Sequence, residues 1–154
     1  MNKEYHLEKH QFIAKSKPEV FDFFKTPENL EKITPKNLNF KIYTPSPIDM
    51  KENALIEYEI KLFGISIYWR TLVNEYKPPN YFRDIQLNGP YDIWDHTHIF
   101  KECQNGTMMI DKIKYSIPYG IIGQLAHFIW VKKELQRIFG YRYKIIEKIF
   151  KETK

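Results

Sequence analysis

The stretch ALIEYEIKLFGISIYWRTLVNEY, residues 54–76, decides the fold. In its first part, residues 54–62, apolar and charged side chains alternate strictly, which is typical of a β-strand with one buried face. Phe63 and Gly64 form a predicted tight turn, and residues 65–76 resume the period of two. Two such segments joined by a short turn predict an antiparallel pair of strands.

More strands are expected on both sides of this pair. Short turns rich in proline, glycine and asparagine separate the segments. The strongest turn signal is Asn105-Gly106, because both residues accept the positive φ of a hairpin turn. The other predicted strands are residues 4–14, 38–44, 81–87, 91–102 and 107–117. Together they make an antiparallel sheet of about seven strands, since the connections are short.

Three helices are predicted. Ser16 and Glu19 have the spacing of a capping box, and Thr26 followed by Pro27 marks the start of a second short helix. Over residues 120–150 the apolar spacing changes to that of one amphipathic helix, roughly 45 Å long. Its expected apolar face holds Leu125, Phe128, Ile129, Leu135, Ile138, Phe139, Ile145, Ile146 and Ile149.

The expected order is one strand, two short helices, six strands and one long helix, in a single domain over residues 1–154. This order belongs to the α+β class. A sheet with one apolar face has to be covered, and the C-terminal helix is the segment of suitable length. A curved sheet and a straight helix cannot touch along their whole length, so we expect a cavity between them.

Composition narrows the class of protein. The net charge is +5, with 19 acidic side chains interspersed among 24 basic ones, and the one cysteine, Cys103, excludes an internal disulfide. No apolar run has the length of a signal peptide or a membrane span, so we expect a cytoplasmic protein. The basic residues of the last helix are expected to form its solvated face: Lys132, Lys133, Arg137, Arg142, Lys144, Lys148 and Lys151.

Four segments carry a family resemblance that covers nearly the whole chain: PEVFDFFKTPENLEKITP, WRTLVNEYKPPNYF, GPYDIWDHTHIF and TMMIDKIKYSIPYG. With them the chain resembles the SRPBCC, or START-like, superfamily, in its bacterial ligand-binding and polyketide cyclase-like branch. The resemblance implies a helix-grip fold, in which a curved antiparallel sheet wraps around a long C-terminal helix. Members of the superfamily include lipid carriers, hormone receptors, cyclases, dehydratases and ring-hydroxylase subunits, which leaves binding and catalysis both open.

The segment YDIWDHTHIF, residues 91–100, holds the most informative polar side chains. The period of two puts Trp94, His96 and His98 on one face. We expect this face to point inward, because the bulky aromatic ring belongs against the helix. On the partner strand Asp111 lies among apolar residues, so its carboxylate needs a partner, and one of the two histidines is the natural candidate.

Three interpretations of this cluster stay open: a hydrogen-bond network in a pocket wall, recognition of the polar end of a ligand, and acid–base catalysis by a histidine–aspartate pair. Two histidines and a carboxylate also have the composition of a metal site, but no metal ion is expected. Arg70 is expected to be exposed. The predicted ligand-binding residues are Tyr58, Trp69, Asp84, Gln86, Trp94, His96, His98, Asp111, Tyr115, Leu125, Phe128 and Ile129, with His96, His98 and Asp111 as catalytic candidates.

The leading functional hypothesis is the binding of a small hydrophobic or amphipathic molecule between the sheet and the C-terminal helix. The alternatives are a cyclase or dehydratase acting on a polyketide-like or aromatic substrate, and a lipid or quinone carrier at a membrane surface. We expect no cofactor, no nucleic-acid partner and no stable membrane insertion, with peripheral membrane contact left open. We expect a monomer or a dimer.

Overall fold

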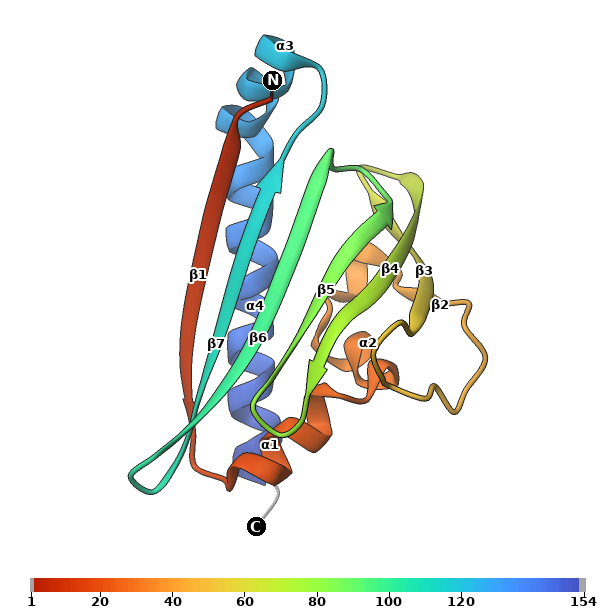
Figure 1. The fold of residues 1–154 in the computed structure, drawn as a ribbon. Coiled ribbons are helices and arrows are strands. Elements are labelled where there is room, and N and C mark those ends of the chain that lie inside the picture. The colour runs from red at the N-terminus through yellow and green to blue at the C-terminus, as the bar shows by residue number, and fades with distance from the viewer. Residues whose placement is uncertain (1, 153–154) are drawn as a thin grey trace.

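A seven-stranded antiparallel sheet bends around a long C-terminal helix in the computed structural model, which describes residues 2–152 (Figure 1). Within these residues the strand order is β1-β7-β6-β5-β4-β3-β2. The strands are β1 (Glu4–Ile13), β2 (Lys41–Ile42), β3 (Leu55–Leu62), β4 (Ile65–Lys77), β5 (Tyr81–Asn88), β6 (Ile93–Cys103) and β7 (Gly106–Ser116). The predicted α+β, helix-grip architecture is confirmed, although the strand predicted at 38–44 shortens to two residues.

The β3–β4 hairpin has the two faces that its alternation predicts. Ile56, Trp69 and Val73 are buried on the inner, concave face of the sheet. Glu57 and Arg70 are register partners on the outer face, where their side chains approach to 3.5 Å and stay partly exposed. The exposed position expected for Arg70 agrees with this arrangement.

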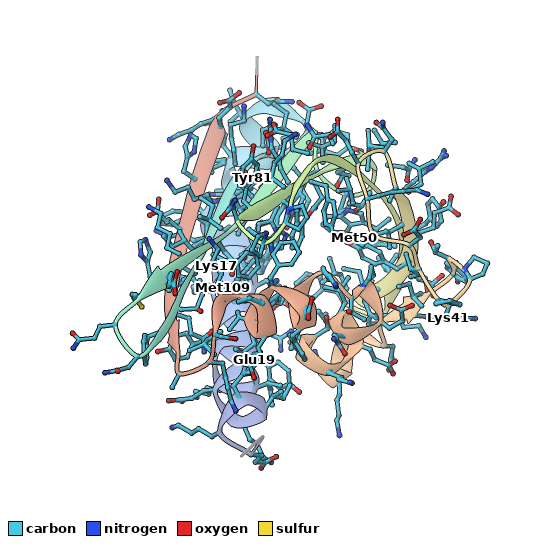
Figure 2. The ribbon with its side chains drawn as sticks, turned by 60° about the horizontal axis from the view of Figure 1, so that its bottom comes forward. Lys17, Glu19, Lys41, Met50, Tyr81 and Met109 are labelled. Atoms are coloured by element: carbon cyan, nitrogen blue, oxygen red, sulfur yellow. The ribbon has the colours of Figure 1, made fainter. Side chains whose placement is uncertain are left out.

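Two short helices close one end of the curved sheet. The helices are α1 (Lys17–Phe24) and α2 (Leu30–Ile33). Two 3-10 turns accompany them: η1 (Pro27–Asn29) precedes α2, and η2 (Lys36–Leu38) follows it. The capping box of Ser16 and Glu19 begins α1, and the second predicted helix begins at Pro27 but starts as a 3-10 turn. In Figure 2, Met50 from the loop before β3 lies between the strands and these helices.

The C-terminal helix is continuous but not uniform. It consists of α3 (Gly120–Ala126), a π-helical turn η3 (His127–Val131) and α4 (Lys132–Glu152). A regular α-helix that buries Leu135 would also turn Phe128, two turns earlier, toward the sheet. The π turn takes one residue more, so His127 takes the inward position at 8% exposure and Phe128 faces out at 79%. The inward positions predicted for Leu125, Phe128 and Ile129 are therefore wrong, because the inserted residue changes the phase of the helix before α4.

The space between the sheet and the C-terminal helix holds the hydrophobic core. One cluster packs α1 against β6, β7 and α4, and its members Phe21, Phe100, Met109 and Ile146 are each at most 2% exposed. This cluster joins the sheet, the first helix and the last helix into one packed body. Among residues 2–152, none of the helices has both the length and the apolar character needed to cross a membrane.

Candidate functional site

A cavity of about 190 Å³ lies between the concave face of the sheet, the short helices and α4. Its walls are mostly apolar and include Phe24, Ile33, Leu38, Phe40, Ile56, Tyr58, Ile60, Trp69, Trp94, Leu135, Ile138 and Phe139. Polar residues also line it: Asp84, His96, His98 and Arg142 lie close together, and Thr26, Asn29, Thr34, Thr71 and Glu134 complete the polar part of the lining. The cavity therefore combines an apolar interior with one local group of charged and titratable side chains.

Three neighbouring strands bring the polar group together. Asp84 is the register partner of His96 across β5 and β6, and His98 is the partner of Asp111 across β6 and β7. Hydrogen bonds run diagonally between these pairs. His96 Nε2 lies 2.7 Å from Asp111 Oδ1, and His98 Nε2 lies 2.9 Å from Asp84 Oδ2. The inward orientation predicted for both histidines is confirmed, and their rings stack with centroids 3.7 Å apart.

This group is almost completely withdrawn from water. His96 and His98 are each 5% exposed, and Asp111 is 7% exposed. Asp111 also lies 3.3 Å from Nδ1 of His98, so one carboxylate contacts both imidazoles. It does not itself line the cavity. Asp111 would therefore influence a bound molecule through the histidines, and not by the direct contact that the sequence predicts.

Arg142 joins this group from α4. The residue is 9% exposed, and its Nη2 lies 3.7 Å from Asp111 Oδ1. Its guanidinium packs against the rings of Phe24 and Phe139, with centroids 5.5 and 5.7 Å away. Within residues 2–152 its Nε has no hydrogen-bond partner. The solvated position predicted for Arg142 is wrong, because this part of α4 faces the sheet.

The sequence does contain a signal for the burial of Arg142. Leu135, Phe139, Arg142 and Ile146 follow one another at intervals of four, three and four residues, so they share one face of α4, and all four are buried. Composition alone assigns an arginine to the solvated face, because arginine is rarely buried without a partner. Here Asp111 supplies the partner.

Burial and neighbouring charges set the protonation of the cluster. Burial alone would raise the pKa of Asp111, but Arg142 and the two hydrogen-bonded histidines hold it well below its ordinary value. Burial lowers the pKa of His96, and the charge of His98 lowers it further. Burial also disfavours the charge on His98, yet the carboxylates of Asp111 and Asp84 outweigh this and raise its pKa. The pKa values of the two histidines therefore shift in opposite directions, and His98 is expected to keep its proton to a higher pH than His96.

Asp84, His96 and His98 each offer a metal-ligating atom, and within the described part of the chain these atoms lie within 4.8 Å of one another. Two histidines and a carboxylate are a known ligand set for transition metals. Here, however, both imidazoles are already bonded to carboxylates, and Arg142 adds a buried positive charge to the cluster. The free Nε of Arg142 within residues 2–152 is a donor, so this part of the cluster suits an acceptor oxygen.

Some of the other predicted site residues line the cavity, and the rest do not. Tyr58, Trp69 and Trp94 line the cavity, as expected. Gln86 does not, because its side chain is bonded to the backbone of the following turn. It donates to the carbonyl of Tyr91 at 2.6 Å and accepts from the Tyr91 N–H at 3.3 Å. Gln86 thereby holds Tyr91, which does line the cavity.

Tyr115 and the predicted residues of the first part of the helix lie outside the cavity. The hydroxyl of Tyr115 is hydrogen-bonded to His127 Nε2 at 2.8 Å, so it fixes the helix to β7 and leaves no open space there. Leu125, Phe128 and Ile129 face away from the cavity because η3 turns His127 inward in their place.

Sequence reasoning missed the part of the cavity that the short helices build. Ile33 of α2, Leu38 of η2 and Phe40 before β2 form one wall. These segments span only three or four residues, which is too short for a helical period to appear in the apolar pattern. The sequence offers no comparable signal for this wall.

Comparisons with known proteins identify the fold. No protein-family model matches the chain, and no curated protein matches it in sequence. Solved structures do match: Zhui aromatase/cyclase from Streptomyces sp. R1128 aligns with a TM-score of 0.76 at 10% identity, over 97% of this chain and 94% of that one. The chain shares the helix-grip fold of this structure.

Two more solved structures share this fold. A protein from Thermus thermophilus, TTHA0849, aligns with a TM-score of 0.74 at 17% identity, over 95% of this chain and 97% of that one. Ara h 8.0201 aligns with a TM-score of 0.62 at 11% identity, over 98% and 100% of the two chains. Identities this low establish the architecture, and the function has to be argued from the site.

Proposed function

We propose that this chain binds a small amphipathic molecule whose apolar body fills the cavity and whose acidic group contacts Arg142. The proposal rests on one observation: Arg142 lines the cavity, is buried, and has an Nε without a hydrogen-bond partner within residues 2–152. A buried unpaired donor costs about 1 to 3 kcal/mol, and more when it is charged. An acceptor oxygen on a bound molecule would recover this free energy.

The rest of the cavity supports an apolar body for the ligand. Aromatic and aliphatic side chains from the sheet, the short helices and α4 form most of its walls, and burying apolar surface there stabilises a complex by about 25 cal/mol per Å². Arginine suits the acidic end because its planar fork of donors matches the oxygens of a carboxylate or sulfonate. A protonated His98 would add a second positive charge to the same wall.

Two fluorescent dyes that differ in one group test the proposal. Anilinonaphthalene sulfonate carries an acidic group, whereas phenylnaphthylamine has the same ring skeleton without it. We expect the sulfonate to bind about tenfold more tightly, since a hydrogen bond to a charged group contributes about 1.5 to 3 kcal/mol. Fluorescence titration should show that Arg142→Met removes this preference while phenylnaphthylamine still binds.

Two further variants establish that the dye occupies the cavity. Ile138→Trp places a larger side chain in the cavity wall and should abolish binding of both dyes. Leu87→Trp, on the exposed end of β5, is the matched control and should leave both affinities unchanged. Equal affinities for the two dyes in the unmodified protein, or binding that survives Ile138→Trp, would overturn the proposal.

Acid–base catalysis on a polyketide-like or aromatic substrate is the second candidate function. One observation favours it: His96 lines the cavity, and its Nε2 is held by Asp111. If Nε2 donates its proton to that carboxylate, Nδ1 is the nitrogen that accepts a proton from a substrate. The lowered pKa of His96, caused first by burial, keeps the ring neutral and able to act as a base.

Turnover of a linear polyketone thioester analogue, followed by chromatography, tests this second function. His96→Gln combined with His98→Gln should abolish cyclisation while binding of phenylnaphthylamine persists. Cyclisation that continues in the double variant at the original rate excludes the two histidines as catalytic residues. Absence of turnover in the unmodified protein leaves ligand binding as the sole function supported by the site.

A further inference from the structure

Six large apolar side chains lie exposed on α3, on η3 and at the residue that precedes α3, at the end of the molecule where β1 also begins (Figure 1). Each of them is between 58% and 84% exposed. They are Tyr119, Ile121, Ile122, Leu125, Phe128 and Trp130, and this group is called the apolar end. Residues three and four apart on a helix are neighbours, so Ile121, Ile122, Leu125 and Phe128 form one surface, and Trp130 is exposed two residues further along. Such a surface marks a site of association.

The inner side of the helical segment that carries the apolar end packs against β1 and β7. His127 is buried, hydrogen-bonded to Tyr115 and stacked on the ring of Tyr5 with centroids 3.5 Å apart. Gly123 packs so closely on the segment between β7 and α3 that a Cβ there would lie 2.1 Å from the carbonyl oxygen of Pro118. The inner side of this helical segment is therefore fully used, and its apolar side chains cannot turn inward without breaking these contacts.

Lysine side chains border the apolar end. Residues 117–133 contain no acidic side chain and finish with Lys132 and Lys133. Lys3 of the first segment lies on the same side, because its Nζ is 5.5 Å from the ring of Tyr5, which stacks on His127. The edge of the apolar surface is thus cationic.

Three acidic side chains lie near this edge: Glu4, which is exposed at the start of β1, and Asp92 and Glu134, which both have partners. Asp92 accepts a hydrogen bond from Asn2, whose carbonyl oxygen in turn accepts from the N–H of Gly120. Glu134 pairs with Arg137 at 2.6 Å. In these contacts, neither Asp92 nor Glu134 is paired with the lysines that border the apolar end.

We propose that the apolar end docks on the surface of an anionic lipid bilayer. Isoleucine, leucine and phenylalanine side chains would enter the boundary between headgroups and acyl chains, while Trp130 and Tyr119 suit the headgroup level. The lysines would contact lipid phosphates, each contributing attraction that salt weakens. A second copy of the chain fits less well, because a twofold contact through this surface would bring the lysines of both copies together.

Vesicle co-sedimentation tests the proposal on the full chain. We expect binding to vesicles of phosphatidylcholine mixed with phosphatidylglycerol, weaker binding at high salt, and little binding to phosphatidylcholine alone. Phe128→Ser should lower the partition coefficient about tenfold, because it removes a large apolar group from the contact. Phe12→Ser, which changes an exposed phenylalanine at the other end of β1, is the matched control and should bind as the unmodified protein does.

Fluorescence gives the orientation of the docked protein. Trp130 is largely exposed, whereas Trp69 and Trp94 line the cavity, so a blue shift on adding anionic vesicles reports mainly on the apolar end. The shift should disappear in Trp130→Phe. A dye attached to the exposed Cys103, in β6 next to the β6–β7 turn, should keep the emission it has in water.

Three results would overturn the proposal: no binding to anionic vesicles at low salt, equal losses for Phe12→Ser and Phe128→Ser, or self-association that Phe128→Ser abolishes in the absence of vesicle binding. The last result would assign the surface to a second copy. The proposal is independent of ligand binding in the cavity. Ile138→Trp should dock on vesicles normally, so failure of one proposal is distinguishable from failure of the other.

Discussion

An arginine pairs with carboxylates on each face of the sheet, and the two networks differ in burial and in completeness. On the outer face, Arg83 donates through Nε and Nη2 to Asp95 at 2.8 and 2.7 Å and through Nη1 to Glu75 at 2.7 Å. On the inner face, Arg142 lies 3.7 Å from Asp111, and its Nε has no partner within residues 2–152. The outer network is complete and reaches solvent, whereas the inner one is desolvated and incomplete. A molecule bound in the cavity can supply the hydrogen bond that the inner network lacks.

The largest expected effect comes from breaking the inner network. Arg142→Met should lower the free energy of unfolding by about 3 to 5 kcal/mol, because the buried carboxylate of Asp111 loses the guanidinium and keeps only the two histidines as partners. Chemical denaturation measures this. Adding Asp111→Asn to the same chain removes the stranded charge and should restore part of the loss. A double variant as unstable as the sum of the two single variants would show that the charges are not coupled.

The pH dependence of stability sharpens the comparison. The raised pKa of His98 gives stability that is complete below the ordinary histidine value of 6.5 and is lost as the pH rises through the raised value. The lowered pKa of His96 acts oppositely: its contribution is complete above 6.5 and is lost as the pH falls through the lowered value. The two histidines together predict greatest stability near pH 6.5.

Urea denaturation across this pH range checks the prediction. His98→Gln should flatten the decline on the alkaline side, and His96→Gln should flatten the decline on the acidic side. Resolved imidazole resonances should show His98 titrating at higher pH than His96. The reverse order would contradict the charge distribution derived for the cavity wall.

The smallest expected effect belongs to the outer network. Arg83→Met should change the free energy of unfolding by about 0 to 1 kcal/mol, because water and salt screen a partly exposed ion pair. Asp95 is the more buried partner and stays close to solvent, so it is not stranded as Asp111 would be. Thermal or chemical denaturation measures the change. A loss as large as that of Arg142→Met would remove the distinction between the two faces.

Much of the fold follows from the period of the apolar residues. Strict alternation in residues 54–62 predicts the inner face of β3, and the period of two in β6 correctly places Trp94, His96 and His98 inside. These predictions succeed because one face of the sheet is buried, so a shift by one residue would expose the whole apolar set.

Two kinds of feature could not be predicted from the apolar period: a change in the phase of a helix, and a buried side chain whose partner is distant in sequence. The π turn η3 adds one residue to the helix. The apolar pattern does not reveal this residue, because the exposed positions 128 and 130 hold apolar side chains, Phe128 and Trp130, where a polar residue would have marked the exposed face. Arg142 has the right spacing for the buried face, but its burial depends on Asp111, which lies on a strand distant in sequence. The volume of the cavity depends on the bend of the sheet and on the short helices.

The central claim is that the cavity accepts an apolar molecule and that Arg142 binds its acidic group. A crystal structure of the protein with anilinonaphthalene sulfonate tests this most directly. The account predicts the naphthalene rings between Trp69 and Ile138, with a sulfonate oxygen accepting a hydrogen bond from Nε of Arg142. A dye found only on the apolar end, or one lying in the cavity with its sulfonate turned away from Arg142, would contradict it.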